Sequence, residues 1–171
     1  VALLIPIVTF QIEQAVFREL IEARDSLSKE KKIISTSIFT VIIQCVIYSL
    51  IFFIAYKYLS NRYKLYLFIN VITAIFSSLF LQISRGLGDN KKYAVGSFIS
   101  AASTIILNVT FLVIIKLRVD GMLLATMLGQ IISCIYLFLS LGMKKYISIK
   151  SFSKKMGISL LKYSIPLIPN Q

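Results

Sequence analysis

Residues Ile33–Tyr56 read IISTSIFTVIIQCVIYSLIFFIAY, a run of 24 residues without one charged side chain. About 20 apolar residues in an α-helix, each adding a rise of about 1.5 Å, cross the ~30 Å hydrocarbon core of a bilayer. Three further runs reach that length without a charge: Leu65–Ser84, Tyr93–Ile115 and Gly121–Met143. Backbone groups in lipid must be satisfied within the segment, and the runs lack the alternation of barrel strands. They therefore predict four membrane-spanning helices.

Two apolar runs at the ends of the chain extend this pattern. Val1–Phe17 predicts a fifth span that carries one acid, Glu13, and Tyr163–Gln171 predicts the start of a sixth. The first residues lack the charged start and the small-residue cleavage site of a signal peptide. Because both ends lie inside apolar runs, we expect the chain to be part of a longer, polytopic all-α membrane protein.

The composition excludes several other classes of protein. Hydrophobic residues make up 57% of the chain and charged residues 15%, against about a quarter charged in soluble domains. There is no histidine, and Cys45 and Cys134 each lie inside an apolar run, so we expect neither a disulfide framework nor a metal site. The net charge of +12 comes from basic residues that flank the apolar runs, which argues against a nucleic-acid partner.

The basic residues also predict an orientation. Arg18–Lys32 holds five Lys and Arg residues, Arg85–Lys92 three and Lys144–Lys162 six, whereas Lys57–Lys64 holds three and Lys116–Asp120 two. Segments between successive spans alternate sides, so 14 basic residues lie on one side and five on the other. Cytoplasmic loops carry the excess of Lys and Arg, which predicts that the first three segments are cytoplasmic.

The longest of these segments allows two interpretations. Lys144–Lys162 mixes six lysines with Ile147, Phe152, Met156 and Leu160. Such a pattern is typical of a basic amphipathic helix on the inner membrane surface. A solvated linker between two halves of a protein would have a similar composition.

Small and polar residues recur at helical spacing within each span. The stripe Gly121, Ala125, Gly129 and Ser133 predicts close helix packing, because small residues four apart let two helices approach. Asparagine and glutamine side chains are larger, so they are less suited to close packing of helices. Five of them either bond across helices or line a polar lumen for hydroxyl-rich cargo: Gln44, Asn70, Gln82, Asn108 and Gln130.

Glu13 is the one acid inside a predicted span, and an ionisable residue there is a functional hypothesis by default. It is either an interfacial residue paired with its neighbours or a cargo or ion contact. Arg18 is placed to meet Gln14 and Glu22 one helical turn away. Arg85–Gly88 lacks the Lys-Ser/Thr of a phosphate-binding loop, and its glycines suit a turn, so we expect neither an enzyme nor a bound cofactor.

Three stretches carry a family resemblance: Ile12–Leu20 (IEQAVFREL), Gln82–Ala94 (QISRGLGDNKKYA) and Leu160–Asn170 (LLKYSIPLIPN). In order and topology they resemble the polysaccharide-export branch of the multidrug/oligosaccharidyl-lipid/polysaccharide exporter superfamily, in particular bacterial flippases for O-antigen or capsule repeat units. The resemblance implies two six-helix bundles around a central cavity. Gln11-Ile12 stands where that family usually has Leu-Gly before the Glu, which weakens the transfer of a role to Glu13.

On that resemblance the chain divides into three parts. Residues 1–143 would form spans two to six of the first transmembrane bundle, 144–162 a cytoplasmic basic inter-bundle loop, and 163–171 the start of the second bundle. The implied function is translocation of undecaprenyl-diphosphate-linked oligosaccharides across the bacterial inner membrane. Expected partners are this lipid-linked cargo, the bilayer and polysaccharide assembly proteins.

The residues we expect to contact such cargo combine charges at the inner mouth with amides along the spans. They are Glu13, Arg18, Arg24, Gln44, Asn70, Gln82, Arg85, Asn108 and Gln130. Three alternatives stay open. One is a multidrug or peptidoglycan-precursor exporter of the same superfamily, and another is a membrane-embedded polysaccharide polymerase or glycosyltransferase. The third is a non-transporting membrane scaffold, in which the amide stripes would serve packing alone.

Overall fold

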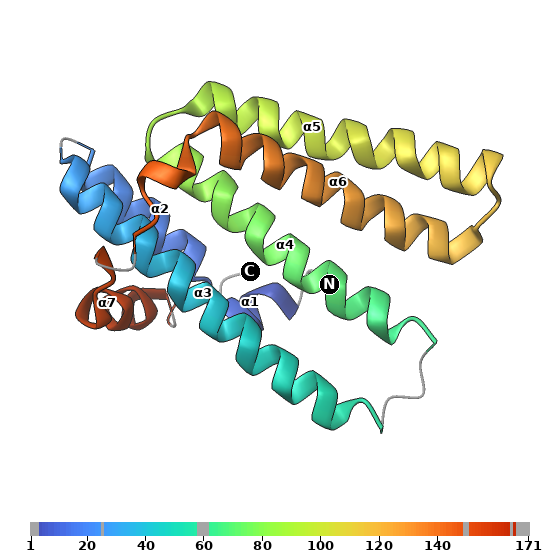
Figure 1. Cartoon of the computed structure of the whole chain (residues 1–171), viewed down its shortest axis with the longest axis horizontal. Helices are drawn as coiled ribbons and strands as arrows, with labels where there is room; N and C mark the ends of the chain where they lie inside the picture. The colour runs from blue at the N-terminus through green and yellow to red at the C-terminus, as the bar shows by residue number, and fades with distance from the viewer. Residues whose placement is uncertain (1–3, 25, 58–61, 149–150, 165, 167–171) are drawn as a thin grey trace.

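The computed structural model describes residues 4–24, 26–57, 62–148, 151–164 and 166. Every regular element in these residues is helical, and the long helices lie side by side (Figure 1). In chain order the elements are α1 (Leu4–Thr9), α2 (Ile12–Glu22), α3 (Leu27–Ala55), α4 (Lys64–Gly86), α5 (Asn90–Val109), the π-helical turn η1 (Thr110–Ile114), α6 (Arg118–Ser140), the 3₁₀ turn η2 (Met143–Lys145) and α7 (Lys154–Ser164). The predicted all-α class is confirmed.

Four of these helices are long and apolar enough to cross a membrane: α3, α4, α5 with η1, and α6. They coincide with the four uncharged runs: each helix begins before its run, and all but α4 end one to three residues before the run does. The largest difference is at the start of α3, which begins at Leu27 instead of Ile33 because the intervening Lys and Glu residues are good helix formers. At about 43 Å, α3 exceeds the ~30 Å hydrocarbon core, so its charged first turns extend beyond it.

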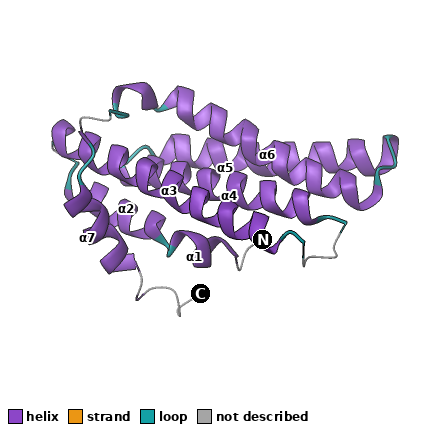
Figure 2. Cartoon of the chain, turned by 60° about the horizontal axis from the view of Figure 1, so that its bottom comes forward, coloured by secondary structure: helices purple, strands orange, loops and turns teal. Residues whose placement is uncertain are grey.

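The arrangement of the helices leaves large apolar surfaces on the outside. α6 lies between α5 and α4, and α1 and α2 lie along α3 and α4 (Figures 1 and 2). Ile54 on α3, Phe98 on α5 and Ile114 on η1 are each more than 70% exposed. A soluble protein rarely exposes so much contiguous apolar surface, whereas a bilayer covers it with acyl chains. The chain is therefore a membrane protein.

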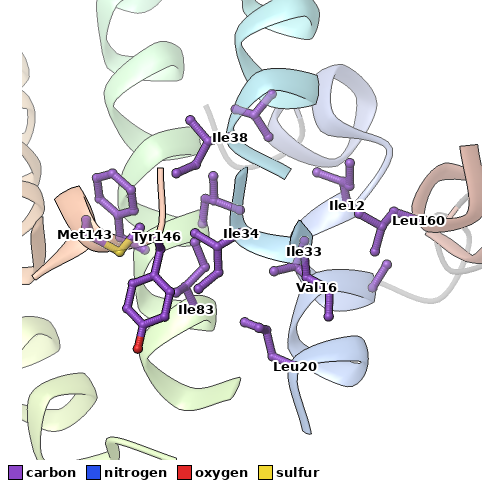
Figure 3. Packing of buried hydrophobic residues seen from close by; sticks show 14 of the residues in the cluster. Ile12, Val16, Leu20, Ile33, Ile34, Ile38, Ile83, Met143, Tyr146 and Leu160 are labelled. Atoms are coloured by element: carbon purple, nitrogen blue, oxygen red, sulfur yellow. The ribbon is translucent and has the colours of Figure 1, made fainter. Parts of the chain in front are cut away.

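The buried core lies toward one end of the bundle, where α2, α3, α4, η2 and α7 meet (Figure 3). Val16 and Leu20 of α2 pack there with Ile34 of α3 and Ile83 of α4, and all four are fully buried. Gly86 allows this approach. A Cβ atom at Gly86 would lie 2.7 Å from Cβ of Leu20, closer than two carbon atoms can sit.

The small-residue stripe of α6 packs as predicted. Gly121, Ala125, Gly129 and Ser133 are all buried. A Cβ at Gly129 would collide with the Thr104 hydroxyl of α5. Ser133 Oγ of α6 donates a hydrogen bond of 2.8 Å to the Gly96 carbonyl of α5. The stripe is therefore the contact surface between α6 and α5, held by close packing and one interhelical bond.

Val1–Phe17, predicted as a fifth span, does not form one continuous helix over its described residues. α1 ends at Thr9 and α2 begins at Ile12, because Phe10 and Gln11 both adopt left-handed backbone conformations, with φ of 50° and 55°. Two consecutive left-handed residues cannot belong to a right-handed helix. Within the described residues, four helices and not five meet the length and apolarity of a membrane span.

Of the two interpretations of Lys144–Lys162, the structure supports a helix over its second half. α7 packs against α2 and α3 and buries Gly157, Leu160 and Ser164 on one face, while its lysines are exposed. Ser35 Oγ of α3 donates to the Tyr146 carbonyl at 2.6 Å. Of the predicted start of the second bundle, Tyr163 and Ser164 complete α7, and residues 165 and 167–171 lie outside the described residues.

The connecting segments are grouped at the two ends of the bundle as expected for spans that cross the membrane in alternating directions. Arg24 donates to the Arg85 and Gly86 carbonyls, and α3 bonds to Tyr146, so the three segments that together hold 14 basic residues meet at one end. At the other end, Arg62 and Asp120 from the two remaining connections are 3.8 Å apart. The segments are grouped as predicted, while the assignment of the first end to the cytoplasm stays a prediction.

Candidate functional site

Three of the predicted site residues lie at this basic end, and Arg24 is the most firmly held of them. Its Nε donates to the Gly86 carbonyl at 2.9 Å and its Nη2 to the Arg85 carbonyl at 3.3 Å. The last carbonyls of a helix have no partner within the helix and carry a partial negative charge. Arg24 therefore caps α4 and ties it to α2, which uses part of its hydrogen-bonding capacity.

Arg85 is the more available cation. Its guanidinium lies 4.6 Å from the ring centroid of Phe17 and 5.8 Å from that of Tyr93, and the side chain is exposed. Aromatic faces attract a guanidinium without occupying its N–H donors. Arg85 is therefore positioned between α2 and α5 with its hydrogen-bonding fork open to an anion.

Arg18 is exposed at the same end and has two partners. Its Nε bonds Glu22 Oε1 at 3.2 Å, and its guanidinium lies 4.4 Å from the ring centroid of Tyr163 in α7. Hydrogen bonding to the side chain of Tyr163, with a smaller contribution from Glu22, raises the pKa of Arg18 above its ordinary value. Arg18 therefore stays positively charged throughout the physiological pH range.

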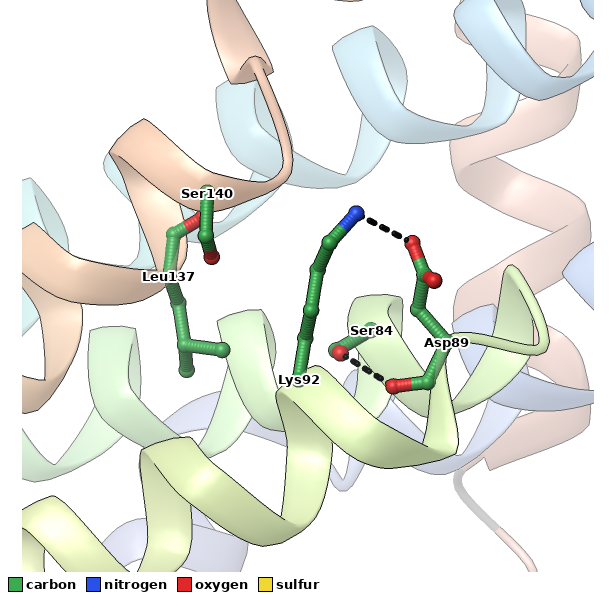
Figure 4. Close-up of polar contacts among 5 residues, drawn as sticks. All are labelled: Ser84, Asp89, Lys92, Leu137 and Ser140. Carbon is green, nitrogen blue, oxygen red and sulfur yellow. Dashed lines mark hydrogen bonds and ion pairs between the residues drawn. The ribbon is translucent and has the colours of Figure 1, made fainter.

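The lysines near Arg85 differ in their partners. Lys92 Nζ lies 2.7 Å from Asp89 Oδ2, and the Asp89 carbonyl accepts a hydrogen bond from Ser84 (Figure 4). Asp89 therefore neutralises one lysine and anchors the turn between α4 and α5. Lys91 is exposed beside it.

Two of the five amides, Asn70 and Gln130, form bonds between α4 and α6. Asn70 of α4 is 1% exposed, and its Nδ2 donates to the carbonyls of Tyr66 at 2.9 Å and Leu123 of α6 at 3.2 Å. Gln130 Oε1 of α6 accepts from the Thr73 hydroxyl of α4 at 2.7 Å. Together they hold α4 against α6, which is the packing interpretation of the amide stripes.

The other three amides have an unused carbonyl oxygen. Gln44 Nε2 donates to the Thr9 carbonyl at 3.0 Å, but its Oε1 has no hydrogen-bond partner among the described residues. Within the same residues, the side-chain oxygens of Gln82 and Asn108 are also buried without a partner. Buried carbonyl groups are normally paired, so each of these oxygens is a candidate ligand contact.

In the described part of the chain, two of the amides, Gln44 and Gln130, line two different cavities. A groove of about 430 Å³ between α5 and α6 is lined mainly by hydroxyl-bearing and small side chains, and Gln130 is the predicted site residue that reaches it. Its lining is Leu81, Ser97, Ser100, Ala101, Thr104, Ile105, Thr126 and Gln130. A second cavity, of about 410 Å³, lies between α1 and α3 and is almost wholly apolar apart from Gln44 and Tyr48.

Glu13 lies apart from the arginines, at the start of α2. It is 7% exposed, and its carboxylate interacts with the Thr9 side chain and its own backbone N–H. Thr9 and Gln11, which adjoin it, are 1% and 3% exposed and were not singled out from the sequence. In a continuous helix Gln11 would point away from Thr9 and Glu13, and only the break brings the three together.

Among the described residues there is no group of three or more His, Cys, Asp or Glu side chains able to hold a metal ion. Comparison with known protein families matches residues 1–171 to the family described as polysaccharide biosynthesis protein. No curated protein and no solved structure gives a significant match. The match covers the whole chain and agrees with its apolar helices. The chain therefore belongs to the polysaccharide biosynthesis protein family of membrane proteins.

Proposed function

We propose that the protein moves undecaprenyl-diphosphate-linked oligosaccharide repeat units from the cytoplasmic to the periplasmic face of the bacterial inner membrane. The observation that carries this proposal is the meeting of Arg24, just after α2, with Arg85 at the end of α4, at one end of a bundle of membrane helices in a chain of the polysaccharide biosynthesis family. The cargo has an anionic pyrophosphate, a polar glycan and an apolar tail. Each part requires a different protein surface.

The basic end supplies the surface for the pyrophosphate. Arg85 holds its guanidinium against Phe17 and Tyr93 with its donors open, and exposed Arg18 and Lys91 add positive charge nearby. Guanidinium groups bind phosphate oxygens in a bidentate manner, so arginine suits this role better than lysine. Arg24 contributes charge while it fixes α2 to α4.

The groove between α5 and α6 is the surface we assign to the glycan. Its serine and threonine hydroxyls and Gln130 can exchange hydrogen bonds with sugar hydroxyls, which both donate and accept. The tail stays in the bilayer along the exposed apolar faces. We propose transport without covalent chemistry, by rocking of this bundle against a second one, as in other transporters built from repeats.

The proposal is tested in cells that lack the chromosomal gene. Their lipid-linked repeat units should accumulate on the cytoplasmic face, and the wild-type gene should restore surface polysaccharide. Arg85→Ala should reduce restoration at least tenfold, whereas Arg85→Lys should retain part of it, because charge remains but bidentate binding is lost. Lys57→Ala at the opposite end is the matched control and should restore fully. Accumulation on the periplasmic face in the deletion strain would refute translocation.

A further inference from the structure

The segment that contains α7 carries positive charge that no acid in it balances. Lys144–Lys162 holds six lysines, and no Asp or Glu residue occurs between Asp120 and Gln171. Five of the six lysines belong to the described residues, and all are exposed: Lys144, Lys145, Lys154, Lys155 and Lys162. Within that part of the chain, none of the five pairs with a carboxylate. The transport steps proposed above do not use these lysines.

α7 is held against the bundle in one orientation. The backbone N–H of Ser153, just before the helix, donates to the Thr36 hydroxyl of α3 at 3.2 Å. A Cβ atom at Gly157 would lie 3.3 Å from Thr40 Oγ1, so α7 and α3 are in close contact. Leu160, on the same side of α7, is fully buried. Because α2 and α3 cover this side, the opposite side of α7 faces away from the bundle.

The outward side of α7 combines lysines with a large apolar side chain. Ile158 is 57% exposed, and Lys154 and Lys162 lie one helical turn before and after it. Lys155 lies three residues before Ile158, on the same side. We call these four residues the outer face of α7. On helices that lie at a membrane surface, apolar side chains enter the acyl layer while lysine stems extend to the headgroups.

The contact with α3 places this face at the depth of a membrane surface. Thr36 and Thr40, which contact α7, follow Lys32, the last charged residue of α3, by four and eight residues. At about 1.5 Å per residue, the contacts lie about 6–12 Å beyond that charge toward the middle of the span. Interfacial helices lie at a similar depth, about 5–10 Å into the boundary between headgroups and acyl chains. α7 is also at the edge of the bundle, beside α2 and α3 (Figures 1 and 2).

We propose that the outer face of α7 binds the anionic headgroups of phospholipids at the basic end of the bundle. Its three lysines pair with lipid phosphates, and Ile158 enters the adjacent acyl layer. At headgroup depth the bilayer is the anionic surface within reach, which favours lipid over a soluble acidic partner. Each lysine beside an anionic membrane surface strengthens binding by about fivefold. The inference does not rest on the proposed cargo, since it is defined by the position and charge of α7.

The surface is tested with phospholipids brominated in their acyl chains, which quench tryptophan fluorescence on contact. Ile158→Trp places a reporter on the outer face of α7 in the purified full-length protein in lipid nanodiscs, and the wild-type signal is subtracted. Brominated phosphatidylglycerol should bind beside the introduced tryptophan at least fivefold more strongly than brominated phosphatidylcholine. High salt should reduce this preference, because it screens the charges. Ile106→Trp, on the exposed side of α5 without a neighbouring lysine, is the matched control, and both lipids should quench it equally.

Removal of the charges separates recognition of headgroups from simple burial in lipid. In the Ile158→Trp protein, Lys154→Gln combined with Lys162→Gln should reduce the preference for phosphatidylglycerol to less than twofold, while phosphatidylcholine still quenches. Lys57→Gln combined with Lys116→Gln removes the same charge at the opposite end of the bundle and should leave the preference unchanged.

Equal quenching of the Ile158→Trp protein by the two lipids would overturn the recognition of anionic headgroups. Quenching by neither would overturn it too, since water or another protein segment would then cover the face. If Ile158→Trp does not fold, the wild type gives the answer: phosphatidylglycerol should slow acetylation of the outer-face lysines more than that of Lys57 and Lys116, and equal slowing would refute the proposal. None of these measurements involves transport, so failure of the lipid surface leaves the proposed cargo standing, and the reverse holds equally.

Discussion

Gly86 shows how one residue controls the contact between α2 and α4. We expect Gly86→Ala to destabilise the protein by about 1–3 kcal/mol, the usual range for inserting a methyl group into a packed contact. The physical reason is the 2.7 Å separation between the added Cβ and Cβ of Leu20. Thermal unfolding in detergent, followed by circular dichroism, measures the change.

A second substitution separates crowding from other effects of Gly86→Ala. Leu20→Ala removes the Cδ1 and Cγ atoms that lie 2.9 and 3.4 Å from the new Cβ but keeps the Leu20 Cβ at 2.7 Å, and alone it should destabilise by about 2–5 kcal/mol through lost burial. The double variant should lose less stability than the sum of the two single variants, because part of the crowding at Gly86 is removed with the Leu20 Cγ and Cδ1 atoms. Strictly additive losses would show that the two side chains do not compete for the same space.

The amides show how far a residue type predicts its role. The sequence predicts Asn70 and Gln130 as polar residues inside spans, and both lie on the expected helices. Their partners, the Leu123 carbonyl and the Thr73 hydroxyl, are 53 and 57 positions away in the chain. Because a sequence pattern contains no distance between helices, it left interhelical bonding and a polar lumen equally open.

At the scale of elements, the break at Phe10 gives the sharpest contrast with expectation. In a continuous helix, glycine would be less favourable than valine at this position. In a left-handed conformation the order reverses, because glycine has no Cβ and a β-branched residue is strongly disfavoured. We therefore expect Phe10→Gly to be more stable than Phe10→Val by about 1–2 kcal/mol.

The comparison of these two variants is made by thermal unfolding in detergent. Both lose the Phe10 ring, which is 42% exposed, so loss of the aromatic contact largely cancels between them. The same pair at Ile43, an exposed position in the middle of α3, is the control and should show valine as the more stable residue. Greater stability of Phe10→Val would mean that residues 4–22 form one helix.

At the scale of the whole molecule, the grouping of basic segments leads to a test of orientation. Ser28→Cys and Asn90→Cys lie at the basic end, and Arg62→Cys lies at the other end. If the basic end is cytoplasmic, a membrane-impermeant maleimide should label only Arg62→Cys in intact cells and all three after permeabilisation. Cys45 is buried and Cys134 half-buried, so both native thiols should react slowly.

The opposite labelling pattern would place the basic end in the periplasm. It would also contradict the proposal that Arg85 binds the pyrophosphate of the cargo on the cytoplasmic side. The protein without introduced cysteines is the control for labelling at Cys45 and Cys134.

The sequence alone determined where the four long spans lie, which segments share an end of the bundle, and that the Gly121–Ser133 stripe is a packing surface. These features follow from local quantities: length, hydropathy and spacing along one helix. Tertiary structure decided that the run around Phe10 is interrupted, that α7 docks on α2 and α3, and that Gln44 bonds the Thr9 carbonyl. Backbone conformation at the break and the pairing of buried polar groups depend on side chains from other helices, which no single segment specifies.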